Sequence, residues 1–160
     1  MATRLPASAF LAITAVAWAD GRMRKEEVAG LMRAARACGV DGEELSRVER
    51  AAAEGIQLED VDIAEMNRWE RALTFAFANW LAKLDGVVNA AELATLRVLG
   101  ERLELEPPRQ QAARSAVFDI AAQPEGHRPE RFDFALLEEK LAEKLPGSFR
   151  ESLIPPERKP

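Results

Sequence analysis

Two short acidic segments of the 160-residue chain have the residue types and spacing of a cation-binding turn. Asp20 and Asp85 each precede a glycine, and a glutamate follows seven positions after each aspartate, at Glu27 and Glu92. This spacing matches the second half of an EF-hand calcium loop, where ligand positions 5 and 12 flank a turn that leads into a helix. Carboxylate oxygens are the ligands that hard cations such as Ca²⁺, Mg²⁺ and Mn²⁺ prefer.

Neither segment is a complete EF-hand loop. In the same alignment the first ligand position falls on Val16 or Leu81, and neither side chain carries an oxygen. One segment thus supplies two carboxylates, which is too few for a tight site. If the two turns pack around a pseudo-twofold axis, four carboxylates converge, and a divalent cation relieves their repulsion. The metal ligands that we predict are therefore Asp20, Glu27, Asp85 and Glu92.

Both segments also have a purely structural interpretation. Asp-Gly pairs form tight turns, and Glu92 stands three residues after Asn89, which is the spacing of a helix capping box. In the first segment Arg22, Arg24 and Lys25 could neutralise the carboxylates without a metal. The residues alone leave both interpretations open.

The offset of 65 residues between the two segments extends beyond them. It aligns further apolar positions, namely Phe10 with Phe75, Val16 with Leu81, Ala17 with Ala82, Leu31 with Leu96, Cys38 with Leu103 and Val40 with Leu105. This self-similarity predicts an internal duplication of one unit that consists of a helix, an Asp-Gly turn and a second helix.

Apolar periodicity is helical along the whole chain, and no stretch alternates long enough to predict a strand. The expected helices cover about residues 8–18, 25–38, 41–55, 68–84, 89–104, 107–122 and 132–145. We therefore predict an all-α, compact bundle of about seven helices, with a helical domain over 5–122, a linker and amphipathic helix over 123–147 and a flexible tail over 148–160. The helix at 68–84 is apolar over most of its circumference and should lie at the centre.

Some details of these elements are also predicted. Asp41 should cap the third helix, with Glu44 in the capping-box position. The helix at 89–104 carries the apolar residues Leu93, Leu96, Val98, Leu99 and Leu103. The acidic connector over 54–67 contains no base and is interpreted as solvated chain with a short helix. A supporting role of this connector at a cation site is the alternative. All three tryptophans are expected in the core.

Composition excludes several function classes. The net charge of −5 and the lack of a basic stripe argue against nucleic acid as a partner. Cys38 is the only cysteine and His127 the only histidine, so neither a disulfide nor a His/Cys zinc site can form within the chain. A catalytic triad would depend on that one linker histidine. We therefore predict that the protein is not an enzyme.

The N-terminal stretch allows two interpretations. Arg4, an apolar run over 7–16 and small residues up to Ala19 are also typical of a cleaved secretory signal. The duplication favours an ordinary buried helix, because cleavage after Ala19 would delete half of a repeat. We accordingly expect a cytoplasmic protein, and no apolar run reaches the length of a membrane span.

The order of these elements resembles the tellurite-resistance TerB-like domain family over about residues 5–122. The resemblance is carried by Trp18 to Gly21 with Glu27, and by Leu84 to Gly86 with Glu92. It implies a non-enzymatic role linked to metal, tellurite or envelope stress, with a divalent cation held at those acidic positions. The basic residues beside the first turn and the extension over 123–160 depart from the family pattern.

A helical adaptor is the alternative function. In that case the acidic turns are structural, and the chain works by holding a partner protein, including a peripheral partner in a membrane-associated complex. The amphipathic helix at 132–145 could then dock onto the partner, or it could cover a groove of its own domain.

Overall fold

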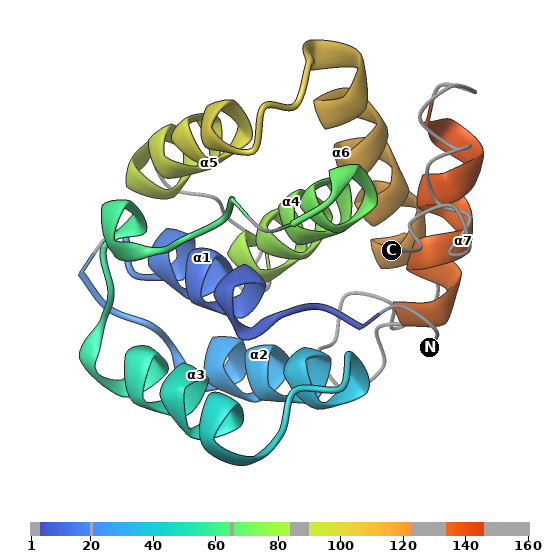
Figure 1. Cartoon of the computed structure of the whole chain (residues 1–160). Coiled ribbons are helices and arrows are strands. Elements are labelled where there is room, and N and C mark those ends of the chain that lie inside the picture. Colours follow the sequence, from blue (N-terminus) through green and yellow to red (C-terminus); the bar gives the residue numbers. More distant parts are fainter. Residues whose placement is uncertain (1–3, 20, 65, 84–89, 123–133, 146–160) are drawn as a thin grey trace.

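The computed structural model describes residues 4–19, 21–64, 66–83, 90–122 and 134–145, and every regular element within these ranges is helical (Figure 1). The elements are α1 (Ala7–Ala17), α2 (Lys25–Ala37), α3 (Gly42–Glu54), the 3₁₀ turn η1 (Leu58–Asp60), α4 (Arg68–Ala82), α5 (Ala90–Arg102), α6 (Pro107–Ala121) and α7 (Phe134–Lys144). The all-α prediction is confirmed, and each α-helix begins and ends within a few residues of the predicted bounds. No helix in the described ranges is long and apolar enough to cross a membrane.

Helices α1 and α4 lie side by side at the centre of the bundle (Figure 1). Both are buried along almost their whole length, and their many alanines let the two backbones approach closely. The Phe10 and Phe77 rings meet across this interface, with centroids 6.0 Å apart. The prediction that the helix at 68–84 is central is therefore confirmed.

The two central helices satisfy their buried polar side chains in the same way. The Thr14 hydroxyl donates to the Phe10 carbonyl at 2.7 Å, and the Asn79 amide donates to the Phe75 carbonyl at 2.8 Å. These bonds remove the cost of burying an unpaired polar group. Both pairs keep the offset of 65 residues, which supports the duplication, although the duplication itself stays a prediction.

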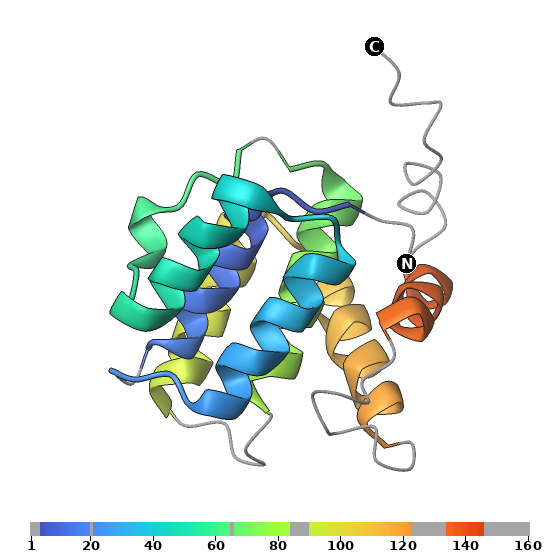
Figure 2. The ribbon, with the colours of Figure 1, turned by 90° about the horizontal axis from the view of Figure 1, so that it is seen from below.

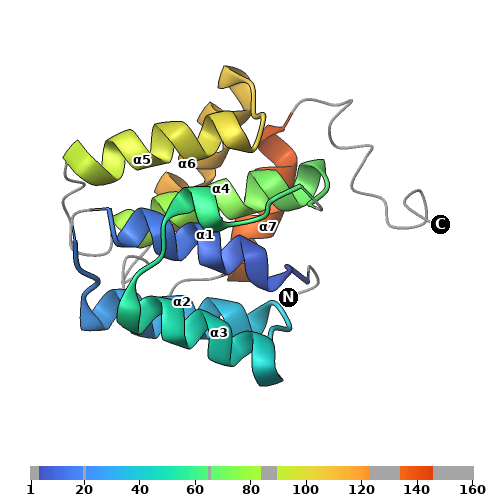
Figure 3. The same ribbon diagram turned by 60° about the vertical axis from the view of Figure 1, so that its left-hand side comes forward.

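Helices α2 and α5 begin at the same end of the molecule (Figures 2 and 3). This follows from the similar direction of α1 and α4, since α2 follows α1 in the chain and α5 follows α4. The two segments that join these helices contain the Asp-Gly pairs. Asp20 and residues 84–89 lie outside the described residues, so the structure does not place either aspartate.

One predicted helix cap is absent, and one helix cap that was not predicted is present. Asp41 does precede α3, but its side chain caps no backbone N–H. Gly42 has a φ of 59°, so the chain enters α3 through a left-handed residue that disrupts regular capping geometry. Asn67 instead forms a full capping box at the start of α4, because its Oδ1 accepts from the Glu70 amide at 2.8 Å while Glu70 Oε1 accepts from the Asn67 amide at 2.9 Å.

Helix α7 packs against α6 at one side of the bundle (Figure 2). The Phe134 ring stands edge-on to Phe77 and Trp80, with centroids 5.5 and 5.3 Å away. The Arg33 guanidinium lies 4.5 Å from the centroid of the Phe134 ring, where a cation–π contact is favourable. The apolar stripe of α7 is thus used inside the bundle, with Leu137 and Leu141 fully buried.

The buried Cys38 gives a prediction on thiol reactivity. Burial, with the negative charge of Glu138 as the second cause, raises the pKa of Cys38 from 9.0 to about 12. The folded thiol should therefore resist Ellman's reagent at pH 8 and react only when denaturant opens the fold. Because the unfolded thiol ionises first, stability should fall as the pH rises above about 9. Rapid stoichiometric labelling in buffer would contradict this.

Candidate binding cleft

The structure places two of the four predicted metal ligands, and it buries both. Glu27 and Glu92 are each 3% exposed and each occupy the third position of their helix, α2 and α5. Glu27 Oε1 accepts from the Arg24 amide at 2.8 Å, so Glu27 has a helix-capping role, which the sequence analysis considered for Glu92 but not for Glu27. Asp20 and Asp85 lie outside the described residues. Within the described residues, no group of three His, Cys, Asp or Glu side chains could hold a metal ion.

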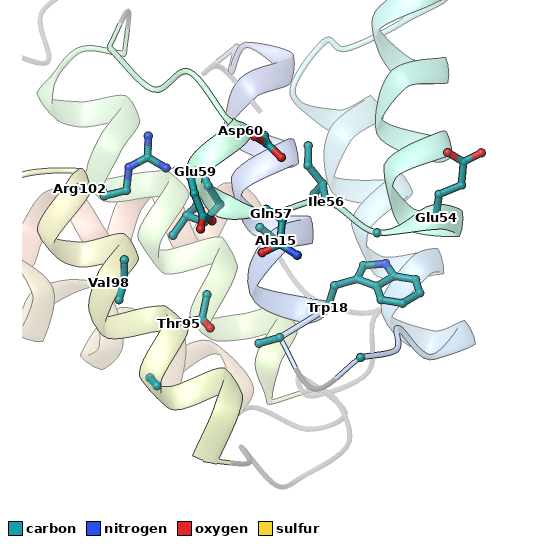
Figure 4. Close-up of a pocket in the computed structure, with 15 residues that line it drawn as sticks. Ala15, Trp18, Glu54, Ile56, Gln57, Glu59, Asp60, Thr95, Val98 and Arg102 are labelled. Carbon is teal, nitrogen blue, oxygen red and sulfur yellow. Dashed lines mark hydrogen bonds between the residues drawn. The ribbon is translucent and has the colours of Figure 1, made fainter.

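A cleft of about 1040 Å³ opens beside the first acidic turn (Figure 4). Its walls come from the end of α1, from the connector between α3 and η1, and from one face of α5. Ala19 and Gly21, which flank Asp20 in the sequence, also contribute to its lining. The other lining residues are Ala15, Trp18, Glu54, Gly55, Ile56, Gln57, Leu58, Glu59, Asp60, Ala94, Thr95, Val98 and Arg102.

Trp18 forms one wall of the cleft and is held in place by α3. Its indole Nε1–H donates to the Ala52 carbonyl at 3.0 Å. The ring lies close to Gly55, where an added Cβ would meet it at 3.4 Å. Trp18 was expected in the core but is only half-buried and lines the cleft. Trp69 is also half-buried and packs against the core, whereas Trp80 is buried as predicted.

The opposite wall is held by Arg102 of α5, which reaches across to η1. Its guanidinium donates to the carbonyls of Leu58 and Val61, the second at 3.0 Å. The connector is also anchored to the core, because Leu58, Val61 and Ile63 are buried. The prediction of a solvated connector is therefore wrong for its apolar residues, which insert into the bundle. The predicted short helix is present as η1.

The rim of the cleft is acidic. Glu54, Glu59 and Asp60 are exposed, and none of them forms an ion pair with another described residue. Arg102 is the one base of the described lining, and its donors are directed at main-chain carbonyls. Three acids and one base give the described lining a formal charge of −2. Beyond Glu54 the charged residues are basic, since Arg47 and Arg50 line an adjoining hollow of about 200 Å³.

Helix α5 exposes two of the apolar residues that it carries. Leu93 and Val98 are 53% and 46% exposed. The core stripe of α5 is instead formed by Leu96 and Leu99. Val98 lies with Thr95 and Arg102 on a second face of the helix, which points toward the cleft (Figure 4). The apolar Val98 on this second face is the feature of the sequence that could have indicated a binding surface on α5.

Gly55, which lines the cleft, has a backbone conformation that favours glycine. Its φ of 91° and ψ of 157° lie in a region that is essentially restricted to glycine, so Gly55→Ala should cost about 1–3 kcal/mol. The added methyl group makes only ordinary contact with Trp18, so the cost comes from the backbone. Urea denaturation followed by circular dichroism would measure it. An unchanged midpoint would show that the residue is not held in this conformation.

No protein-family model, no curated protein and no solved structure matches this chain.

Proposed function

We propose that the protein is a non-enzymatic helical interaction domain that holds a partner protein in the cleft between α1, η1 and α5. The observation that carries this proposal is the cleft itself, which combines the half-buried Trp18 and the exposed Val98 with an acidic rim. Tryptophan is among the side chains that contribute most to binding energy at protein interfaces. A concave, partly apolar surface with a few placed polar groups is the usual form of a binding site.

The polar groups of the cleft favour binding over catalysis. Glu54, Glu59 and Asp60 are exposed to water at the edge of the cleft, where they can attract a partner of opposite charge. Arg102 stabilises the wall through two carbonyls and so has a structural task.

Photo-cross-linking tests the adaptor function. A benzophenone amino acid placed at position 98 in the cleft should form an adduct with a protein partner in the native cell. The same probe at position 118 on α6, which is 67% exposed and outside the cleft, is the matched control. The adduct at position 98 should disappear in the Glu59→Lys/Asp60→Lys background. No adduct at position 98, or the same adducts at both positions, would overturn the proposal.

Divalent-cation binding by a TerB-like domain is the second candidate function, and it would place the protein in a metal, tellurite or envelope stress response. The observation that favours it is the matched placement of Glu27 and Glu92. Both are buried in the first turn of helices that begin at the same end of the bundle (Figures 2 and 3). Carboxylate oxygens are the ligands that hard divalent cations prefer, so two carboxylates at one end of the fold could contribute to one cation site.

Calorimetry tests the cation site. Titration with Ca²⁺, Mg²⁺ and Mn²⁺ should give a heat of binding with a dissociation constant of roughly 1 mM or tighter. Asp85→Asn should remove this heat, whereas Glu143→Gln on the exposed side of α7 should leave it unchanged. Absence of heat from the wild type, at protein concentrations that detect millimolar binding, would rule out the cation site and leave the adaptor function standing.

A further inference from the structure

The cleft has three features that together define the chemistry of its partner, and the first is charge. Glu54, Glu59 and Asp60 form an acidic rim whose carboxylates have no ion pair among the described residues. Such a rim attracts and orients a partner of opposite charge. A basic surface or segment is therefore the complementary ligand.

The second feature is a stretch of main chain that is free to pair. Gly55 to Gln57 belongs to no helix and runs along the cleft, and the Gln57 dihedral angles, −93° and 142°, are those of extended chain. Within the described part of the protein, the amides of Ile56 and Gln57 and the carbonyls of Gly55 and Ile56 make no hydrogen bond. Water or a ligand must satisfy such groups. An extended peptide can do so by adding its own main chain to this edge.

The third feature is an apolar part of the lining. Trp18, Ile56 and Val98 line the cleft, from the end of α1, from the connector and from α5 respectively (Figure 4). An aliphatic side chain placed among them would lose its contact with water, which is favourable in proportion to the area removed. One apolar anchor is therefore expected between the basic residues of the partner.

We propose that the cleft binds an extended basic segment of the partner protein, in which one aliphatic residue is flanked by lysines or arginines. The aliphatic side chain lies between Trp18 and Val98, the main chain pairs with Ile56 and Gln57, and the flanking bases meet Glu59 and Asp60. This inference rests on the proposed adaptor function and specifies its partner.

A synthetic probe tests the inference in the full-length protein. The probe is a fluorescein-labelled pentapeptide with a central leucine and two lysines on each side, followed by fluorescence anisotropy. Glu59→Gln/Asp60→Asn should weaken binding roughly five- to tenfold, because two exposed charge pairs are lost. Val98→Ser should weaken it by a similar factor through loss of the apolar contact. Glu139→Gln/Glu143→Gln, which removes two exposed acids of α7, is the matched control and should bind like wild type.

Two modified probes separate the contributions of charge and main chain. A pentapeptide with glutamates in place of the lysines should not bind, and one with N-methylated amides beside the leucine should bind roughly tenfold more weakly. Equal affinity of the wild type and both cleft variants, or equal binding of the glutamate probe, would overturn the basic-segment inference. If the probe fails while the cross-link at position 98 persists, the partner chemistry is wrong but the adaptor function holds.

Discussion

Replacing Phe134 with alanine is expected to lower the free energy of unfolding by about 3–5 kcal/mol. Phe134 is 5% exposed and anchors α7 to the core of the bundle. Its ring contacts Phe77 and Trp80 edge-on and lies under the Arg33 guanidinium. Truncation therefore removes a large apolar side chain, two aromatic contacts and a cation–π contact at once, and it leaves a cavity. Guanidinium chloride denaturation would measure the loss.

Phe118 provides the matched control for this substitution. It is also a helical phenylalanine, but it is 67% exposed on α6, so Phe118→Ala should change stability by no more than about 0.5 kcal/mol. Equal losses for both variants would show that Phe134 does not anchor α7 to the core. A deletion of residues 123–160 should accordingly destabilise the domain, because it uncovers the same apolar surface.

Replacing Arg102 with alanine is expected to cost about 2–3 kcal/mol of stability and to open the cleft. The guanidinium donates to the Leu58 and Val61 carbonyls, which join η1 to α5. Without it, these carbonyls lose charged donors, and hydrogen bonds to charged groups are stronger than neutral ones. Thermal unfolding would measure the stability. Fluorescence anisotropy would measure the affinity for the basic probe, which should fall because Arg102 no longer holds the segment that carries Glu59 and Asp60.

Arg97 on the same helix is the matched control for Arg102. It is exposed and outside the cleft, so Arg97→Ala removes the same charge without touching η1. If the two variants were equally stable and bound the probe equally, Arg102 would not hold the wall. If Arg97→Ala alone weakened the probe, binding would depend on features outside the cleft.

The helices could be predicted from the sequence because their information is local. The periodicity of apolar residues defined each α-helix to within a few residues, and the glycine after Cys38 and the prolines at 107 and 108 indicated where helices end or begin. The capping of α3 was wrong because Gly42 adopts a left-handed conformation that the Asp41 pattern does not reveal.

The cleft could be predicted only in fragments because it depends on contacts across the chain. The bond from Arg102 to Leu58 joins residues 44 positions apart, and the Trp18 bond to Ala52 joins residues 34 apart. The sequence did single out the acidic connector and the first Asp-Gly turn, and both border the cleft. Neither pattern shows that α5 packs across them, and the apolar residues of α5 do not by themselves show which of them face the core and which face the cleft.

The convergence of the two acidic turns remains a prediction, because it also depends on contacts between residues far apart in the chain. The spacing predicts that Glu27 and Glu92 occupy equivalent first-turn positions, and the structure confirms this placement with both side chains buried. Whether four carboxylates share one ion depends on Asp20 and Asp85, which the titration with divalent cations addresses.

Chemical-shift mapping is the most direct test of the claim that the cleft is the binding surface. Spectra of the ¹⁵N-labelled protein should be recorded while the unlabelled lysine–leucine pentapeptide is added. The largest amide shifts should fall on residues 55–60 and on Val98, and the indole N–H of Trp18 should shift with them. Shifts confined to α6 and α7, or no shifts at concentrations at which anisotropy detects binding, would contradict the account.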